Sequence, residues 1–329
     1  MLNSDAKLSG KIFADDIPQA PTRDGFGTGS VEAGKADPRV VVLCADLKES
    51  TRAEQFEKVF PERFIEMGVA EQNMATVASG MAAAGKIPFI ASYAAFSPGR
   101  NYEQIRTTIA LNRMPVKICG MHAGVSVGPD GATHQMLEDI GMMRMLPGMT
   151  VIVPGDAEEA RKAVVAAATH DGPVYLRFGR ATTPVFTTTD TPFRIGKALT
   201  LWEDSAPNVA LLATGSMSYT ALSAARTLSE NGIGCIVLHV SSVKPLDEEA
   251  ILDAARKASR VITVEEHQAA GGFGSAVAEF LAENCPVPVK RLGIADHFGQ
   301  SGTPEELLKH YGLDMSAIFD AVKGFVKDI

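Results

Sequence analysis

The sequence has 329 residues, a length that suits two compact domains better than one. Its formal net charge of −8 disfavours a nucleic-acid or anionic-membrane binder, and no apolar run is long enough to span a membrane. The four cysteines form no C-x-x-C pair, and the first twenty residues contain no apolar signal segment. We therefore expect a cytoplasmic protein without disulfide bonds.

Residues 1–19 are polar and weakly patterned, and we interpret them as an N-terminal arm. Strand-like and helix-like segments then alternate. Short apolar runs predict strands at 39–47, 63–69, 87–96, 115–121, 150–156 and 173–180. Helices are predicted at 71–85, 101–113 and 157–170.

The predicted helix at 71–85 has small residues on all sides, so we expect it to be buried against other backbone. It is also a candidate interface element.

A second set of alternating segments follows a Thr/Pro-rich linker, which we place at 186–192. The predicted strands are 208–216, 235–243, 260–267 and 289–296, and the helices are 217–231, 247–258 and 272–284. Strands buried on both faces and joined by crossover helices are typical of parallel sheets. The sequence thus predicts an α/β protein with two open, mostly parallel-sheet domains, at 20–185 and 193–329.

Polar and aromatic side chains follow the predicted strands of the first domain. Ligands bind at the carboxyl ends of strands in open parallel sheets, so these side chains are candidate site residues. Each also has an ordinary explanation: Glu71 suits a helix N-terminus, and Tyr93 and Phe96 suit a core. Their clustering favours function. The side chains are Lys48, Glu49, Ser50, Glu71, Tyr93, Phe96, Arg100, His122, Asp130, His134 and Arg180.

Three segments resemble a known family. MGVAEQNMATVASGMAAAG is similar to the pyrimidine-domain signature of transketolases and deoxyxylulose-phosphate synthases, and GPDGATHQMLEDIGMMRMLPGMTVIVPGDAEEA is similar to the segment that follows it. VITVEEH and GGFGSAV resemble the family's C-terminal domain. The resemblance covers nearly the whole chain, from about Arg23 on, and it implies a pyrimidine-binding fold followed by a transketolase C-terminal fold, as in the C-terminal half of a split transketolase.

The resemblance implies thiamine diphosphate as the cofactor. By position, Glu71 matches the glutamate that contacts N1′ of the aminopyrimidine, where a protonated carboxyl favours the imino tautomer. Phe96, with Tyr93 beside it, matches the aromatic wall on which the pyrimidine stacks. Tyr102 is an approximate match for a third aromatic residue of that pocket.

The resemblance also implies a substrate site. Arg23, Ser50, His122 and Arg180 match the residues that transketolases place around a sugar phosphate, and arginine forks with neutral donors suit such a group. Asp130 and His134 match residues that bind donor-sugar hydroxyls. We predict Glu71 and His134 as the catalytic residues.

The sequence has no G-D-G…N segment, which holds the cofactor diphosphate through Mg²⁺ in this family. The loop at 271–276 could bind an anion at a helix N-terminus, but tight packing is the favoured interpretation. We expect no metal site here and a separate subunit that binds Mg²⁺ and the diphosphate. Two copies of each chain would form an α2β2 heterotetramer that shares thiamine diphosphate across its interface.

The expected function is transfer of a two-carbon ketol unit between phosphorylated sugars, as in the pentose phosphate reactions. His122 favours this over a deoxyxylulose-phosphate synthase, which carries an acid and an arginine at this place. The segment SPGRNYEQIR is closer to the synthase pattern. A synthase-like or 2-oxo-acid decarboxylating half, and a non-catalytic partner-binding subunit, stay open as alternatives.

Overall fold

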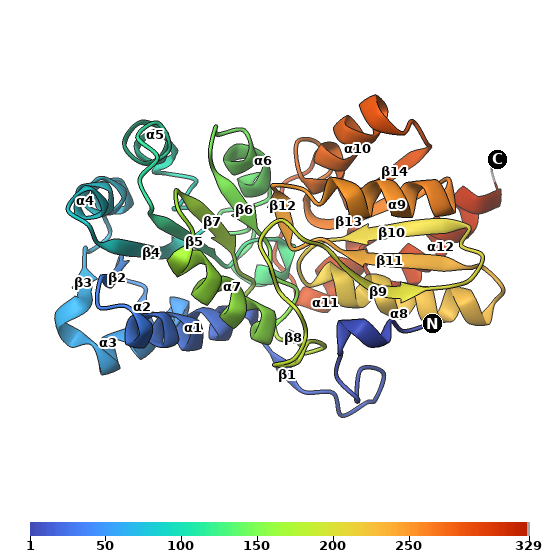
Figure 1. Ribbon diagram of the computed structural model, residues 1–329, viewed down its shortest axis with the longest axis horizontal. Helices are drawn as coiled ribbons and strands as arrows, with labels where there is room; N and C mark the ends of the chain where they lie inside the picture. The colour runs from blue at the N-terminus through green and yellow to red at the C-terminus, as the bar shows by residue number, and fades with distance from the viewer. Residues whose placement is uncertain (328–329) are drawn as a thin grey trace.

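The computed structural model describes residues 1–327. Two α/β units lie side by side along the long axis, the first built around a seven-stranded sheet and the second around a five-stranded sheet (Figure 1). Both sheets are mostly parallel, which confirms the predicted fold class. None of the helices described over residues 1–327 is long and apolar enough to cross a bilayer.

The first sheet has the strand order β12-β6-β7-β5-β4-β2-β3. All its strands are parallel except β12, which comes from the second half of the chain and pairs antiparallel with β6. The two halves therefore share a sheet. The strands are β2 (Val40–Cys44), β3 (Phe64–Glu66), β4 (Ile87–Tyr93), β5 (Lys117–Met121), β6 (Thr150–Ile152), β7 (Val174–Arg177) and β12 (Ser242–Lys244).

Helices cover both faces of the first sheet (Figure 1). On β2, Val41 and Leu43 join the core that contains α4, whereas Val40 and Val42 join the core that contains α1 and α7, so alternate residues serve opposite faces. One face carries α4 (Glu71–Ala83), α5 (Tyr102–Gln104), the π-helical η3 (Ile105–Ala110) and α6 (Asp139–Arg144). The other carries α1 (Thr22–Ala36), α2 (Lys48–Thr51), α3 (Glu54–Val59) and α7 (Ala157–Thr169).

Helix α4 is shorter than predicted and is buried on one face only. Gln72, Asn73, Thr76 and Gly80 are exposed. The expectation that this helix is buried all round is therefore wrong for the single chain. The predicted helix at 101–113 is also shorter, and it passes directly from α5 into the wider turns of η3.

The second sheet has the strand order β14-β13-β10-β11-β9, and only β9 is antiparallel. Its strands are β9 (Leu199–Glu203), β10 (Val209–Ala213), β11 (Cys235–His239), β13 (Val261–Gln268) and β14 (Val289–Ile294). Helices α9 and α10 share a core with α4, whereas α8 and α12 belong to a separate core. The helices are α8 (Met217–Glu230), α9 (Glu248–Ala258), α10 (Phe273–Asn284), α11 (Pro304–His310) and α12 (Met315–Lys327).

The predicted arm and linker both pack against the rest of the chain. In the arm, Leu2 bridges to Trp202, and the carbonyl of Ile12 accepts the Tyr219 hydroxyl at 2.8 Å, so the arm lies on the second unit. In the linker, the backbone N–H of Thr187 donates to Asp156 at the start of α7. The domain limits predicted from the sequence stay a prediction.

Short elements complete the chain: η1 (Ser4–Ala6), β1 (Gln19–Ala20), η2 (Pro61–Arg63), η4 (Val125–Val127) and β8 (Thr183–Pro184).

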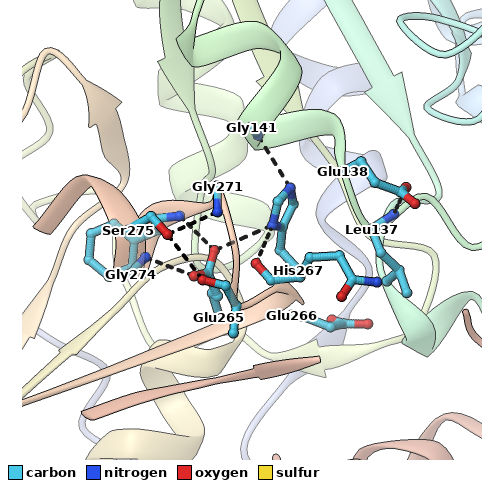
Figure 2. A network of polar contacts seen from close by, with 12 residues as sticks. Leu137, Glu138, Gly141, Glu265, Glu266, His267, Gly271, Gly274 and Ser275 are labelled. Carbon is cyan, nitrogen blue, oxygen red and sulfur yellow. Dashed lines mark hydrogen bonds and ion pairs between the residues drawn. The ribbon is translucent and has the colours of Figure 1, made fainter. Parts of the chain in front are cut away.

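A buried polar network joins α6 of the first unit to β13 and α10 of the second (Figure 2). The His267 ring nitrogen Nε2 accepts the backbone N–H of Gly141 at 3.3 Å. The Glu265 carboxylate accepts the N–H groups of Phe273 and Gly274, each at 2.7 Å, at the start of α10. Burial raises the pKa of Glu265 to about 7. Because Glu265 already occupies this helix N-terminus, the packing interpretation of the loop at 271–276 agrees with the structure.

Candidate active site at the edge of the first sheet

The candidate residues gather where β2, β4, β5 and β7 end. Glu71 begins α4, and its side chain is 1% exposed. The Ser92 hydroxyl donates to one carboxylate oxygen at 3.3 Å, and the Arg100 guanidinium pairs with the other at 3.0 Å. Asn101 donates to the Glu71 carbonyl at 3.1 Å. Glu71 is thus a buried acid held in a fixed place at a helix N-terminus.

Two aromatic rings form a platform beside this edge. Tyr93 ends β4, and its ring is nearly parallel to that of Phe96, with an interplanar angle of 14° and centroids 5.9 Å apart. His134 stands edge-on to both, with centroids 5.5 Å from Phe96 and 6.1 Å from Tyr93. Flat apolar faces with a polar ring at their edge suit a stacked heterocycle.

A cationic cluster adjoins the platform. The buried His122 ring lies 4.2 Å from the Tyr93 ring between centroids, and its Nε2 is 2.9 Å from an Arg23 guanidinium nitrogen. Arg23 also donates to the Ser50 carbonyl at 2.9 Å, and the Ser50 and Tyr93 hydroxyls are 2.7 Å apart. Burial, and then the charge of Arg23, lower the pKa of His122 to about 3, so its ring is neutral at pH 7.

Arg180 lies on the far side of this cluster. It donates to the Val127 carbonyl at 3.0 Å and pairs with Asp130 at 3.3 Å. Burial is the main cause of the lowered pKa values of His122 and Arg23, and the charge of Arg180 lowers both further. Neutral His122 among three arginines, with Arg52 as the third, is an arrangement that favours an anion.

The structure therefore brings nearly all the predicted residues to one edge, but Tyr102 lies apart. Its hydroxyl donates to the Met142 carbonyl at 3.2 Å, and its ring packs against the core beneath α4. Among the described residues, Tyr102 makes no ring contact with Tyr93 or Phe96. Its role in the pyrimidine pocket stays a prediction.

Arg100 was noted in the sequence only as a residue that follows β4, with no role of its own. Its guanidinium pairs with Glu71 and also lies over the Phe96 ring, 4.8 Å from the centroid. Ser92 and Asn101, which hold the Glu71 carboxylate and backbone, were missed. Ser92 lies inside β4 and Asn101 lies in the loop that follows it, so their place beside a strand that ends at the site was the signal that could have found them.

The geometry fits half of a thiamine diphosphate site. A buried carboxylate lies next to an aromatic platform, and the planar Arg100 guanidinium already contacts both. For the diphosphate, no three His, Cys, Asp or Glu side chains within residues 1–327 come together in a way that could hold a metal ion. Glu71, Tyr93 and Phe96 are the residues that would hold the aminopyrimidine of that cofactor.

Comparisons with known proteins identify the family. Family models for the transketolase pyrimidine-binding domain and the transketolase C-terminal domain match residues 19–185 and 196–318. A 6-deoxy-6-sulfo-D-fructose transketolase subunit, SqwH, from Clostridium sp. is 42% identical, covering 91% of this chain and 92% of that protein. One of the subunits of an apulose-4-phosphate transketolase, from Phocaeicola vulgatus, is 40% identical over 93% of this chain and 97% of that protein.

A solved structure described as a split-gene transketolase, an inactive beta4 tetramer, is 43% identical and superposes with a TM-score of 0.87. The match covers 93% of this chain and 98% of that one. Both relatives and this solved structure are thus matched over nearly their whole length. The chain therefore belongs to the transketolase family and corresponds to its C-terminal half, the pyrimidine-binding domain followed by the C-terminal domain.

Proposed function

We propose that this chain is the pyrimidine-binding subunit of a thiamine-diphosphate-dependent transketolase that moves a two-carbon ketol unit between phosphorylated sugars. The proposal rests on the 4.2 Å distance between the ring centroids of Tyr93 and His122. Through this contact the Glu71 carboxylate and its aromatic platform adjoin the arginine cluster. One end of this edge suits a heterocycle and the other suits a phosphate.

At the heterocycle end, Glu71 holds N1′ of the aminopyrimidine, and Tyr93 and Phe96 support the ring. The bound cofactor supplies the electron sink for carbon–carbon cleavage. The Ser92 hydroxyl donates to the Glu71 carboxylate, and the start of α4 buries it, so the carboxyl is held in one position and away from water. His134, at the edge of the platform, is placed to bind a donor hydroxyl and to move its proton.

At the phosphate end, Arg23 and Arg180 supply charge and directed N–H donors. Their present acceptors are the Ser50 and Val127 carbonyls, the His122 ring nitrogen Nε2 and the Asp130 carboxylate. A phosphate group would add acceptors to guanidinium groups that lie close together. Asp130 is then free to accept a sugar hydroxyl.

The proposed partner carries the diphosphate site and Mg²⁺, and the assembly is α2β2. Three observations support a partner: the chain has no G-D-G…N segment, two relatives are called subunits, and the 43% identical structure is described as an inactive tetramer of a split-gene transketolase. The exposed polar face of α4 lies next to Glu71 and is available to such a partner. We place the enzyme in the cytoplasm, because the four cysteines are free.

A synthase-like activity is the second candidate, because the segment 97–106 resembles that branch more closely. The two candidates differ in the donor, so the reconstituted complex should be given xylulose 5-phosphate or pyruvate as donor, with glyceraldehyde 3-phosphate or ribose 5-phosphate as acceptor. Consumption of xylulose 5-phosphate without decarboxylation of pyruvate supports the transketolase. Decarboxylation of pyruvate with little ketol transfer contradicts it.

A further inference from the structure

Arg100 makes two contacts that the aminopyrimidine is proposed to make. Its guanidinium is 3.0 Å from one oxygen of the Glu71 carboxylate, and its carbon Cζ lies 4.8 Å from the centroid of the Phe96 ring. A guanidinium is planar, donates hydrogen bonds from its edge and stacks on aromatic faces. An aminopyrimidine that contacts Glu71 and stacks on Phe96 is likewise planar, meets the carboxyl with its ring edge and stacks on an aromatic face.

Other groups already contact Glu71 and Phe96 on their remaining sides. The remaining oxygen of Glu71 accepts from Ser92, and the acid is 1% exposed. Phe96 is bounded by Tyr93, by His134 and by Arg100. A heterocycle that contacts the Arg100-paired oxygen of Glu71 and stacks on the Phe96 face under the guanidinium must therefore take the place of that guanidinium.

Arg100 can vacate that side. Its side chain is 48% exposed, and Glu71 is its only ion-pair or hydrogen-bond partner among the described residues. Its backbone is fixed, because its N–H donates to the Phe96 carbonyl at 3.0 Å and a Cβ at Gly99 would lie 2.1 Å from the Ala95 carbonyl oxygen. Rotation of the side chain thus needs no movement of the loop.

We propose that Arg100 acts as an internal stand-in for the aminopyrimidine: it fills the half-site in the free subunit and must be displaced when thiamine diphosphate binds. This inference rests on the proposed function. Arg100 then sets the affinity for the cofactor, because each binding event breaks the Arg100–Glu71 pair and the Arg100–Phe96 contact. It also keeps Glu71 paired while the partner subunit is absent.

The experiment is equilibrium dialysis of thiamine diphosphate with Mg²⁺ against the complex of this chain and its partner, without substrate. Arg100→Gln removes the charge and keeps hydrogen-bonding capacity. We expect the Kd for thiamine diphosphate to fall about tenfold, the effect of losing one competing charged contact. Arg106→Gln is the matched control: this exposed arginine of η3 makes no contact with Glu71 or Phe96 in the described structure, so its Kd should stay unchanged.

A second variant separates competition from a supporting role for Arg100. In a Glu71→Gln background the ion pair is already lost, so Arg100→Gln should change the Kd by less than it does in the native background. An unchanged or higher Kd in Arg100→Gln, with folding intact by circular dichroism, overturns the inference. If neither the native complex nor the variant binds the cofactor, the proposed function fails and this inference fails with it; binding by the variant alone supports both.

Discussion

The Tyr93 and His122 rings lie with their centroids 4.2 Å apart, and this contact joins the two ends of the site. Tyr93 belongs to the aromatic platform beside Glu71, and His122 belongs to the cluster around Arg23. Tyr93 ends β4 and His122 directly follows the neighbouring parallel strand β5, so the sheet itself sets the spacing. The aromatic platform and the arginine cluster are therefore held next to each other by the sheet.

Glu71→Gln tests the proposed acid. Glutamine keeps the volume and an acceptor for Ser92, so the fold and the assembly should be retained, whereas proton exchange with N1′ is lost. We expect turnover of the reconstituted enzyme to fall by about a hundredfold or more. Glu103→Gln, at an exposed carboxylate of α5, is the control and should be near normal. Near-normal turnover in Glu71→Gln ends the assignment.

Arg180→Ala tests the phosphate end. The KM for phosphorylated sugars should rise about ten- to a hundredfold, because a charged hydrogen bond is lost. The KM for hydroxypyruvate, which has no phosphate, should change little. Steady-state kinetics with both donors measures the difference. Arg194→Ala, an exposed arginine without an ion pair in the described part of the chain, should alter neither value. An equal rise for both donors removes Arg180 from the phosphate site.

His134→Ala tests the residue at the edge of the platform. Ketol transfer should fall by about a hundredfold, because a positioned proton donor is lost. Thiamine diphosphate binding should persist, since Tyr93 and Phe96 still stack on each other. Activity assays and cofactor dialysis on the same preparation separate the effects, with His310→Ala on α11 as an exposed control. Loss of cofactor affinity would make His134 a structural residue instead.

Lys117, far from the site at the start of β5, gives a test of pH and stability. Its buried ammonium donates to the His170 and Gly172 carbonyls, and burial lowers its pKa to about 7. The unfolded chain keeps this proton up to its ordinary value near 10.5, so unfolding takes up a proton between these values. Burial of the charged Lys117 therefore lowers the free energy of unfolding fully below about pH 7. That free energy rises as the pH increases from about 7 to 10.5.

Lys117→Met should remove this rise. We expect the free energy of unfolding of the native protein, relative to Lys117→Met, to increase from pH 7 to pH 9 by up to about 1.4 kcal/mol per pH unit. Urea denaturation at a series of pH values measures it, with Lys35→Met on the exposed side of α1 as the control. If the free energies of unfolding of the native protein and Lys117→Met change in parallel with pH, Lys117 has the same pKa in the folded and unfolded chain, which contradicts this prediction.

The sequence predicted the alternating elements well where local pattern decides them. Buried runs such as β2, β10 and β13 were identified, as were α8, α9 and α10. Glu71, Tyr93 and Phe96 were placed at one edge, because parallel strands end together. Pattern alone does not show a contact such as the one between Arg100 and Glu71, since that depends on the path of the loop after β4.

Helix α1 shows why other parts were missed. Its sequence, TRDGFGTGSVEAGKA, contains glycines that disfavour a helix locally. They are present because α1 and α7 pack closely: a Cβ at Gly25 would lie 2.2 Å from the Ala157 carbonyl oxygen, and one at Gly29 would lie 2.8 Å from that of Arg161. Strand β12 was predicted only as the end of the strand at 235–243; it is a separate strand because it pairs with β6, far away in the sequence.

The proposed active site is shared between two kinds of subunit. The most direct measurement is ketol transfer from xylulose 5-phosphate to ribose 5-phosphate, with thiamine diphosphate and Mg²⁺, by the chain alone, by its diphosphate-binding partner alone and by the mixture. A shared site predicts activity in the mixture only. Activity from this chain alone, or a mixture that assembles and stays inactive, would contradict it.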